Sequence, residues 1–139
     1  MIDCFDGEHF FLSNFYECPV HYGLFTFSSS EAAFQASKAT SEELAKKFTK
    51  LTPNASKKLG RKIPLRSDWE EVKDTIMYQI VFAKFIQNPD LREKLLATGN
   101  EELIEGNWWG DTYWGVHNGI GQNKLGKILM KVREKLKEN

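Results

Sequence analysis

The chain has 139 residues, of which 27% are charged, and its 19 Lys and Arg balance its 19 Asp and Glu to a formal net charge of zero. This length fits one domain with one core, and the zero net charge makes a broad basic face for duplex nucleic acid unexpected. The two cysteines are too few for a disulfide framework. We expect a cytoplasmic protein because no signal peptide opens the chain and no apolar run reaches the roughly 18 residues of a membrane helix.

The three histidines are widely separated, and no Cys or His pair has the spacing of a zinc site. We therefore expect no metal and no cofactor.

The first elements in chain order are a short apolar segment and a hairpin. Residues 9–15 (HFFLSNF) indicate the end of an apolar strand followed by a turn at Ser13–Asn14. Residues 19–27 (PVHYGLFTF) place two β-rich runs on either side of Tyr22–Gly23, which predicts a β-hairpin.

A helix is predicted next, with Ser28 and Glu31 forming a capping box. Glu31 and Lys38 are seven residues apart, close to two helical turns, so they share a face with Gln35. This places a carboxylate, an amide and an ammonium in one row. For Glu31 the spacing alone favours a capping role over a catalytic one, because a carboxylate at a helix start suits the helix dipole.

Periodic apolar residues predict five further helices, two of them opened by capping boxes at Thr40–Glu43 and Ser67–Glu70. They run over residues 40–51, 53–60, 68–86, 88–98 and 122–137. Trp69 lies in the first turn of the third, where its ring can project past the helix end. Residues 101–105 indicate a short strand. The outline is a helix-rich α+β fold with a small antiparallel sheet, in a single domain over residues 1–139.

Residues 106–126 (GNWWGDTYWGVHNGIGQNKLG) hold three of the four tryptophans and six glycines, which predicts a loop. Loops are normally polar, so these indoles either close over a ligand or cover an edge of the core. The glycine turn at 118–121 precedes a helix, and free N–H groups at a helix start suit a phosphate.

Six blocks of the chain resemble the NADAR family, also called YbiA-like, and they follow the family's order over nearly the whole length. The blocks are FFLSNFY, SSEAAFQASKA, LGRKIPLRSDWEEVKDTIM, NPDLREKLLATGNEELIEG, DTYWG and GQNKLGKILMKVRE. The resemblance implies an N-glycosidase. One branch of the family hydrolyses ribosylamino-pyrimidine phosphate intermediates of riboflavin synthesis. Another removes ADP-ribose from modified guanine in nucleic acid, often beside a toxin ADP-ribosyltransferase, which is then an expected partner.

The resemblance also implies roles for single residues. Glu31 and Asp111 match the catalytic carboxylates, one of which would stabilise an oxocarbenium-like sugar or activate water. Trp69 and Trp114 match residues suited to clamp a flat base, and Lys38 would hold phosphate or ribose oxygens. The other substrate-binding candidates are Asn14, Gln35, Gly119 and Gln122.

The chain departs from the family pattern at two places. Ala32–Ala33 follows Glu31 where the family often has His and an aromatic residue, and Trp108–Trp109 is a bulky insertion before Asp111. The extra indoles favour the larger substrate, ADP-ribosylated guanine in nucleic acid, over the riboflavin intermediate. A module that binds ADP-ribose or NAD without cleaving it is the alternative from another class.

Overall fold

The structure, a computed structural model, describes residues 1–138, and the chain packs as two compact units. One unit is formed by Asn14–Asn88. The other combines Met1–Ser13 with the chain from Pro89 to the C-terminus. Each unit is described by itself below, and one domain over residues 1–139 stays a prediction.

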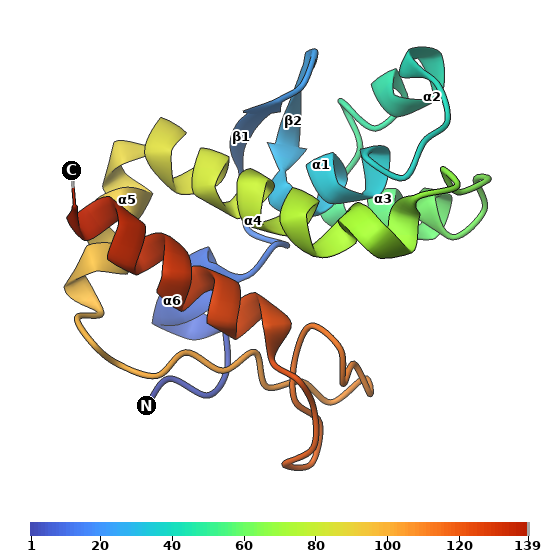
Figure 1. The fold of residues 1–139 in the computed structure, drawn as a ribbon. Coiled ribbons are helices and arrows are strands. Elements are labelled where there is room, and N and C mark those ends of the chain that lie inside the picture. Colours follow the sequence, from blue (N-terminus) through green and yellow to red (C-terminus); the bar gives the residue numbers. More distant parts are fainter. Residues whose placement is uncertain (139) are drawn as a thin grey trace. The chain divides into compact units, whose positions relative to one another are not determined.

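The Asn14–Asn88 unit joins a two-stranded sheet to four helices (Figure 1). Its elements are β1 (Glu17–Tyr22), β2 (Phe25–Ser29), α1 (Ser30–Ala36), α2 (Glu42–Lys46), α3 (Pro53–Gly60) and α4 (Trp69–Gln87). The strands are antiparallel and Gly23 has a φ of +63° between them, so the predicted hairpin is confirmed. Val20 pairs with Phe27, and both are buried. α4 packs across β1, while α1 packs against β2, α3 and α4.

The predicted capping boxes are wrong by one residue. Ser29, and not Ser28, caps α1, since its Oγ accepts the N–H of Ala32 at 3.0 Å. The Ser28 hydroxyl instead donates to the Leu51 carbonyl at 2.7 Å, a contact distant in sequence that no local pattern contains. Ser41 likewise caps α2 in place of Thr40, and Asp68 precedes α4 without a side-chain cap bond.

Two of the predicted helices end earlier than expected. α1 stops at Ala36, so Lys38 lies in the turn that follows it. α2 stops at Lys46, because the chain then closes onto carbonyls three residues back, with Phe48 bonded to Ala45 and Thr49 to Lys46. The helix after Thr52–Pro53 is confirmed as α3, with the Thr52 side chain accepting from the N–H of Ala55.

The second unit contains η1 (Gly7–Leu12), α5 (Pro89–Ala97) and α6 (Lys124–Lys137). The strand end predicted over residues 9–15 is wrong, since η1 is a 3₁₀-helix that buries Phe11 and Leu12. The strand predicted over 101–105 is also wrong, because only an isolated bridge from Ile2 to Leu103 forms there. α5 and α6 pack together (Figure 1).

The helix-rich α+β class with a small antiparallel sheet is thus confirmed. Within residues 1–138, none of the helices is both long and apolar enough to cross a membrane.

Candidate functional site

Two residues of the row predicted on α1, Glu31 and Gln35, lie on one face of the helix and contact each other. Gln35 donates from Nε2 to Oε2 of Glu31 at 2.6 Å, so the predicted common face is confirmed for these two residues. Glu31 is 8% exposed and Gln35 is 5% exposed. A buried carboxylate is costly unless hydrogen bonds compensate it, and the Gln35 amide supplies one.

Asn14 fixes the start of the same helix. Its carbonyl accepts the N–H of Glu31 at 3.1 Å, and its Oδ1 accepts the Ser30 hydroxyl at 2.8 Å. Its Nδ2 lies 3.5 Å from the sulfur of Met77. The predicted substrate-binding residue Asn14 is therefore buried and holds the backbone that carries Glu31.

The Gln35 side chain packs against Gly60. Its Oε1 is buried and has no hydrogen-bond partner among the described residues. A Cβ built at Gly60 of α3 would collide with that oxygen, so only glycine leaves room for it. Gly60 thereby determines where Gln35 stands, and Gln35 in turn holds Glu31. The sequence showed Gly60 only as the end of a helix.

Lys38 and Trp69 meet beside Phe34. The Lys38 ammonium lies 5.9 Å from the centroid of the Trp69 ring, which packs 5.0 Å from the Phe34 ring. Burial lowers the pKa of Lys38, the negative charge of Glu31 partly offsets this, and the nearby cations Arg61, Lys57 and Lys73 lower it further. Lys38 is thus a partly desolvated cation within the electrostatic reach of Glu31.

Its position in the first turn of the helix predicted that the Trp69 ring could project past the end of α4. The ring is buried instead. It is 5% exposed, and the Phe34 ring is one of the groups packed against it. Its ring therefore supports Lys38 in this unit, and it offers little open face for a base.

In the second unit, Asp111 organises the tryptophan loop. Its Oδ1 accepts the N–H groups of Tyr113 at 3.0 Å and Trp114 at 2.9 Å. Asn107 closes the preceding turn, since its Oδ1 accepts from Gly110 and Asp111 and its Nδ2 donates to the Asp111 carbonyl at 2.9 Å. One carboxylate oxygen of Asp111 therefore already stabilises the loop backbone.

The start of α6 is covered by the loop that precedes it. The N–H groups of residues 122–125 donate to carbonyls of residues 112–115: Gln122 to Thr112, Asn123 to Gly115, Lys124 to Tyr113 and Leu125 to Trp114. The prediction of phosphate binding at Gly119 and Gln122 rested on free N–H groups at this helix start. These donors are occupied, because the loop folds back, which glycine content alone does not reveal.

The three loop tryptophans differ in exposure. Trp108 is 83% exposed and Trp109 is 50% exposed, with their rings edge to face at 5.6 Å. Trp114 is half-buried against Tyr113, at 4.8 Å between centroids. The prediction that the indoles cover an edge of the core is therefore wrong for Trp108.

The structure brings together one group of predicted site residues in each unit. Asn14, Glu31, Gln35, Lys38 and Trp69 belong to the Asn14–Asn88 unit. Asp111, Trp114, Gly119 and Gln122 belong to the other. The predicted pairing of the Glu31 and Asp111 carboxylates across a sugar stays a prediction.

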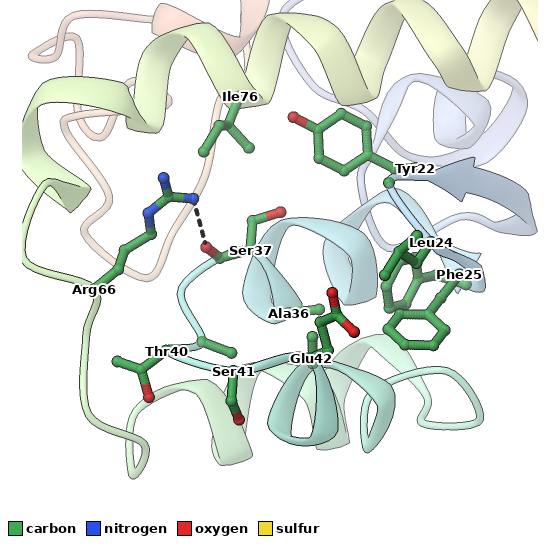
Figure 2. A pocket seen from close by; sticks show the side chains of 14 residues that line it. Tyr22, Leu24, Phe25, Ala36, Ser37, Thr40, Ser41, Glu42, Arg66 and Ile76 are labelled. Atoms are coloured by element: carbon green, nitrogen blue, oxygen red, sulfur yellow. Dashed lines mark hydrogen bonds between the residues drawn. The ribbon is translucent and has the colours of Figure 1, made fainter.

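A separate hollow of about 390 Å³ lies between the hairpin and the end of α1, and none of the predicted site residues lines it (Figure 2). Arg66 borders it but is already engaged, bonding both oxygens of Asp68 at 2.6 and 3.0 Å and the Ser37 carbonyl at 3.5 Å. The Arg66 guanidinium at the edge of this hollow is thus already paired within the protein.

Comparison with known proteins gives a consistent result. The NADAR domain family model matches residues 4–137. A protein of Shigella boydii named N-glycosidase YbiA is 39% identical over 128 residues, which is 89% of this chain and 79% of that protein. A riboflavin biosynthesis protein of Vibrio vulnificus is 39% identical over 96% of this chain, and the chain spans 37% of that protein's length.

The fold also matches a solved structure. The NMR structure of the Escherichia coli protein YbiA superposes with a TM-score of 0.86 and 34% sequence identity. The match covers 99% of this chain and 88% of that one.

Proposed function

Because this chain belongs to the NADAR domain family, we propose that it is an N-glycosidase that removes ADP-ribose from ADP-ribosylated guanine in nucleic acid. The hydrolysis of an N-glycosyl compound is supported by the relatives named N-glycosidase. The observation that carries the chemistry is the buried Glu31 carboxylate, held by Gln35 at 2.6 Å with Lys38 in electrostatic reach.

The reaction breaks the bond between the anomeric carbon and the base nitrogen. Positive charge develops on the sugar as this bond lengthens, and a carboxylate in a site of low polarity stabilises that charge strongly. Glu31 then accepts a proton from the attacking water, whose oxygen bonds to the anomeric carbon. The leaving nitrogen takes up one proton, so water is divided between the two products.

Lys38 is suited to bind the negatively charged groups of the substrate. An ammonium that is partly desolvated and backed by the Trp69 ring binds an anion more strongly than one in open water. We assign it the phosphate or ribose oxygens. Gln35, with its amide committed to Glu31, acts by positioning that carboxylate.

The guanine branch is favoured by the exposed indole of Trp108. An aromatic ring open to solvent suits a nucleic-acid substrate, because every base has a face that stacks on it. A toxin ADP-ribosyltransferase as a partner stays a prediction that depends on this branch.

A second substrate, a ribosylamino-pyrimidine phosphate of riboflavin synthesis, is favoured by a different observation. The Vibrio vulnificus relative and a chloroplastic relative of Arabidopsis thaliana, 40% identical over half of this chain, are both named riboflavin biosynthesis proteins. This chain spans 37% and 12% of their lengths, so their names apply to much longer proteins.

The test is to incubate the purified protein, with EDTA present, with an ADP-ribosylated guanine oligonucleotide and separately with the aminopyrimidine ribosyl phosphate. Products are identified by mass. We expect free ADP-ribose and an unmodified oligonucleotide from the first. Ribose 5-phosphate released only from the second substrate would assign the chain to the riboflavin branch. Tight binding of ADP-ribose with neither substrate cleaved would identify a binding module.

A further inference from the structure

The exposed indole of Trp108 is held on a braced turn. Asn107, the residue before it, uses both ends of its amide to close the turn, accepting the N–H of Gly110 at 3.1 Å and donating to the Asp111 carbonyl at 2.9 Å. The ring of His117 lies 3.1 Å from the Asn107 carbonyl. A large apolar side chain that is 83% exposed on such a support is presented to solvent at a fixed place.

We propose that Trp108, with Trp109 beside it, is a stacking platform for unpaired bases of a single-stranded nucleic acid. This inference rests on the proposed function, because it concerns the strand that carries the modified guanine. It adds a second contact on the substrate, to bases other than the modified one.

The size of the surface favours bases over a protein partner. With about 250 Å² for a whole Trp side chain, the exposed fractions of Trp108 and Trp109 leave roughly 300 Å² open. A stable protein–protein interface needs about 800 Å² on each partner. A surface of this size accommodates one or two bases. The interplanar angle of 87° between the indoles turns their faces in different directions, so each ring can take its own base.

Charges of both signs lie around the loop, since the Glu105 carboxylate accepts from the Asn107 side chain at 3.3 Å. The cations available to phosphates are Lys124, 4.7 Å from the centroid of the Tyr113 ring, and the exposed Lys127 one turn further along α6. Because loop carbonyls bind the first N–H groups of α6, these cations belong to the same part of the unit as the loop. Asp111 directs one oxygen to the N–H groups of Tyr113 and Trp114, which compensates part of its negative charge.

A single strand is indicated over a duplex. A duplex keeps its bases stacked inside, and its recognition depends mainly on a broad positive face, whereas this chain has a formal net charge of zero. Stacking on an indole needs an unpaired base and is tolerant of sequence. We therefore expect binding to single-stranded DNA or RNA with little dependence on base identity.

The experiment measures binding of unmodified, fluorescein-labelled 12-residue oligonucleotides by fluorescence anisotropy, as single-stranded DNA, single-stranded RNA and duplex DNA. We expect Trp108→Ala to weaken single-strand binding by about fivefold to a hundredfold, the range for loss of one stacked base. Trp108→Phe keeps a ring and should recover most of the affinity. Leu24→Ala is the matched control, since Leu24 is also apolar, is 65% exposed and lies in the other unit.

Two results would overturn the platform: single-strand binding unchanged in Trp108→Ala, or duplex bound as tightly as single strand. The platform is also overturned if the wild-type protein binds none of the three oligonucleotide probes. ADP-ribose release from a modified oligonucleotide is measured in parallel. If ADP-ribose is released but single-strand binding does not depend on Trp108, the stacking platform is wrong and the proposed function still holds. If single-strand binding depends on Trp108 but no substrate is cleaved, the proposed function is wrong and the stacking platform still holds.

Discussion

At the scale of single residues, the candidate site depends on side chains that hold other side chains. Glu31 has its backbone fixed by Asn14 and its carboxylate fixed by Gln35. Gln35 in turn stands where it does because Gly60 has no Cβ. The sequence predicted that Glu31 and Gln35 share a face, since helical spacing requires it. It did not predict the part played by Gly60, because that contact joins α1 to α3.

Gly60→Ala should therefore slow catalysis without touching substrate. The new methyl group displaces the Gln35 amide, so the carboxylate of Glu31 loses its support and kcat falls about tenfold or more, with KM changed less than about twofold. Steady-state kinetics measure both constants. Lys58→Gly, an exposed position in the same helix, costs about 1 kcal/mol of stability and serves as the control. Equal kcat values in the two variants would assign Gly60 a purely structural role.

Lys84 gives a second prediction at this scale. It is 1% exposed in α4, with its ammonium 5.7 Å from the centroid of the Tyr16 ring, and burial lowers its pKa from 10.5 to about 8. The unfolded chain then binds more protons than the folded one between those two values. The free energy of unfolding should accordingly rise as the pH increases from about 8 to 10.5. Urea denaturation at several pH values measures this slope, and a Lys84→Met protein with the same slope contradicts the assignment.

At the scale of elements, apolar periodicity predicted which segments are helical, and it misplaced their starts. Hydroxyl residues are adjacent at the caps of α1 and α2, so the sequence alone could not say which one faces the first turn. The choice is made by tertiary contacts, as when Ser28 bonds the Leu51 carbonyl and leaves the cap to Ser29. The start of α6 shows the same limit, because a loop eight or more residues back in the chain occupies its donors.

The cap of α1 can be tested directly. Ser29→Ala removes the acceptor for the N–H of Ala32 in a fully buried position and should lower the free energy of unfolding by about 1 kcal/mol. Thermal and urea denaturation measure the change. Because α1 carries Glu31, kcat should also fall. Ser41→Ala, which removes the cap of α2, is the comparison, since α2 carries none of the candidate site residues. A Ser29→Ala protein as stable as wild type would show that the cap contributes nothing.

At the scale of the whole molecule, the order of the six sequence blocks indicated the family, and the fold follows it. The sequence could not predict that the candidate residues are distributed over two units. Glu31 and Lys38 are close along the chain, whereas Asp111 comes from a segment about 80 residues away whose position no local pattern determines.

The proposed pairing of the two carboxylates predicts coupled effects. If Glu31 and Asp111 act on the same sugar, Asp111→Asn should slow turnover, and the Glu31→Gln, Asp111→Asn double variant should lose less than the product of the two single losses. Single-turnover rates of the four proteins measure this coupling. Losses that simply multiply, together with a stability loss in Asp111→Asn, would confine Asp111 to its role in the loop backbone.

The most direct measurement is the single-turnover rate of ADP-ribose release by Glu31→Gln, made alongside its affinity for the same ADP-ribosylated oligonucleotide. The glutamine keeps the size of the side chain and one acceptor oxygen for the Gln35 amide, while removing the negative charge. The predicted result is affinity near that of wild type with a rate at least about a hundredfold lower, the scale of a lost acid–base group. Release at the wild-type rate would remove Glu31 from the chemistry and contradict the account.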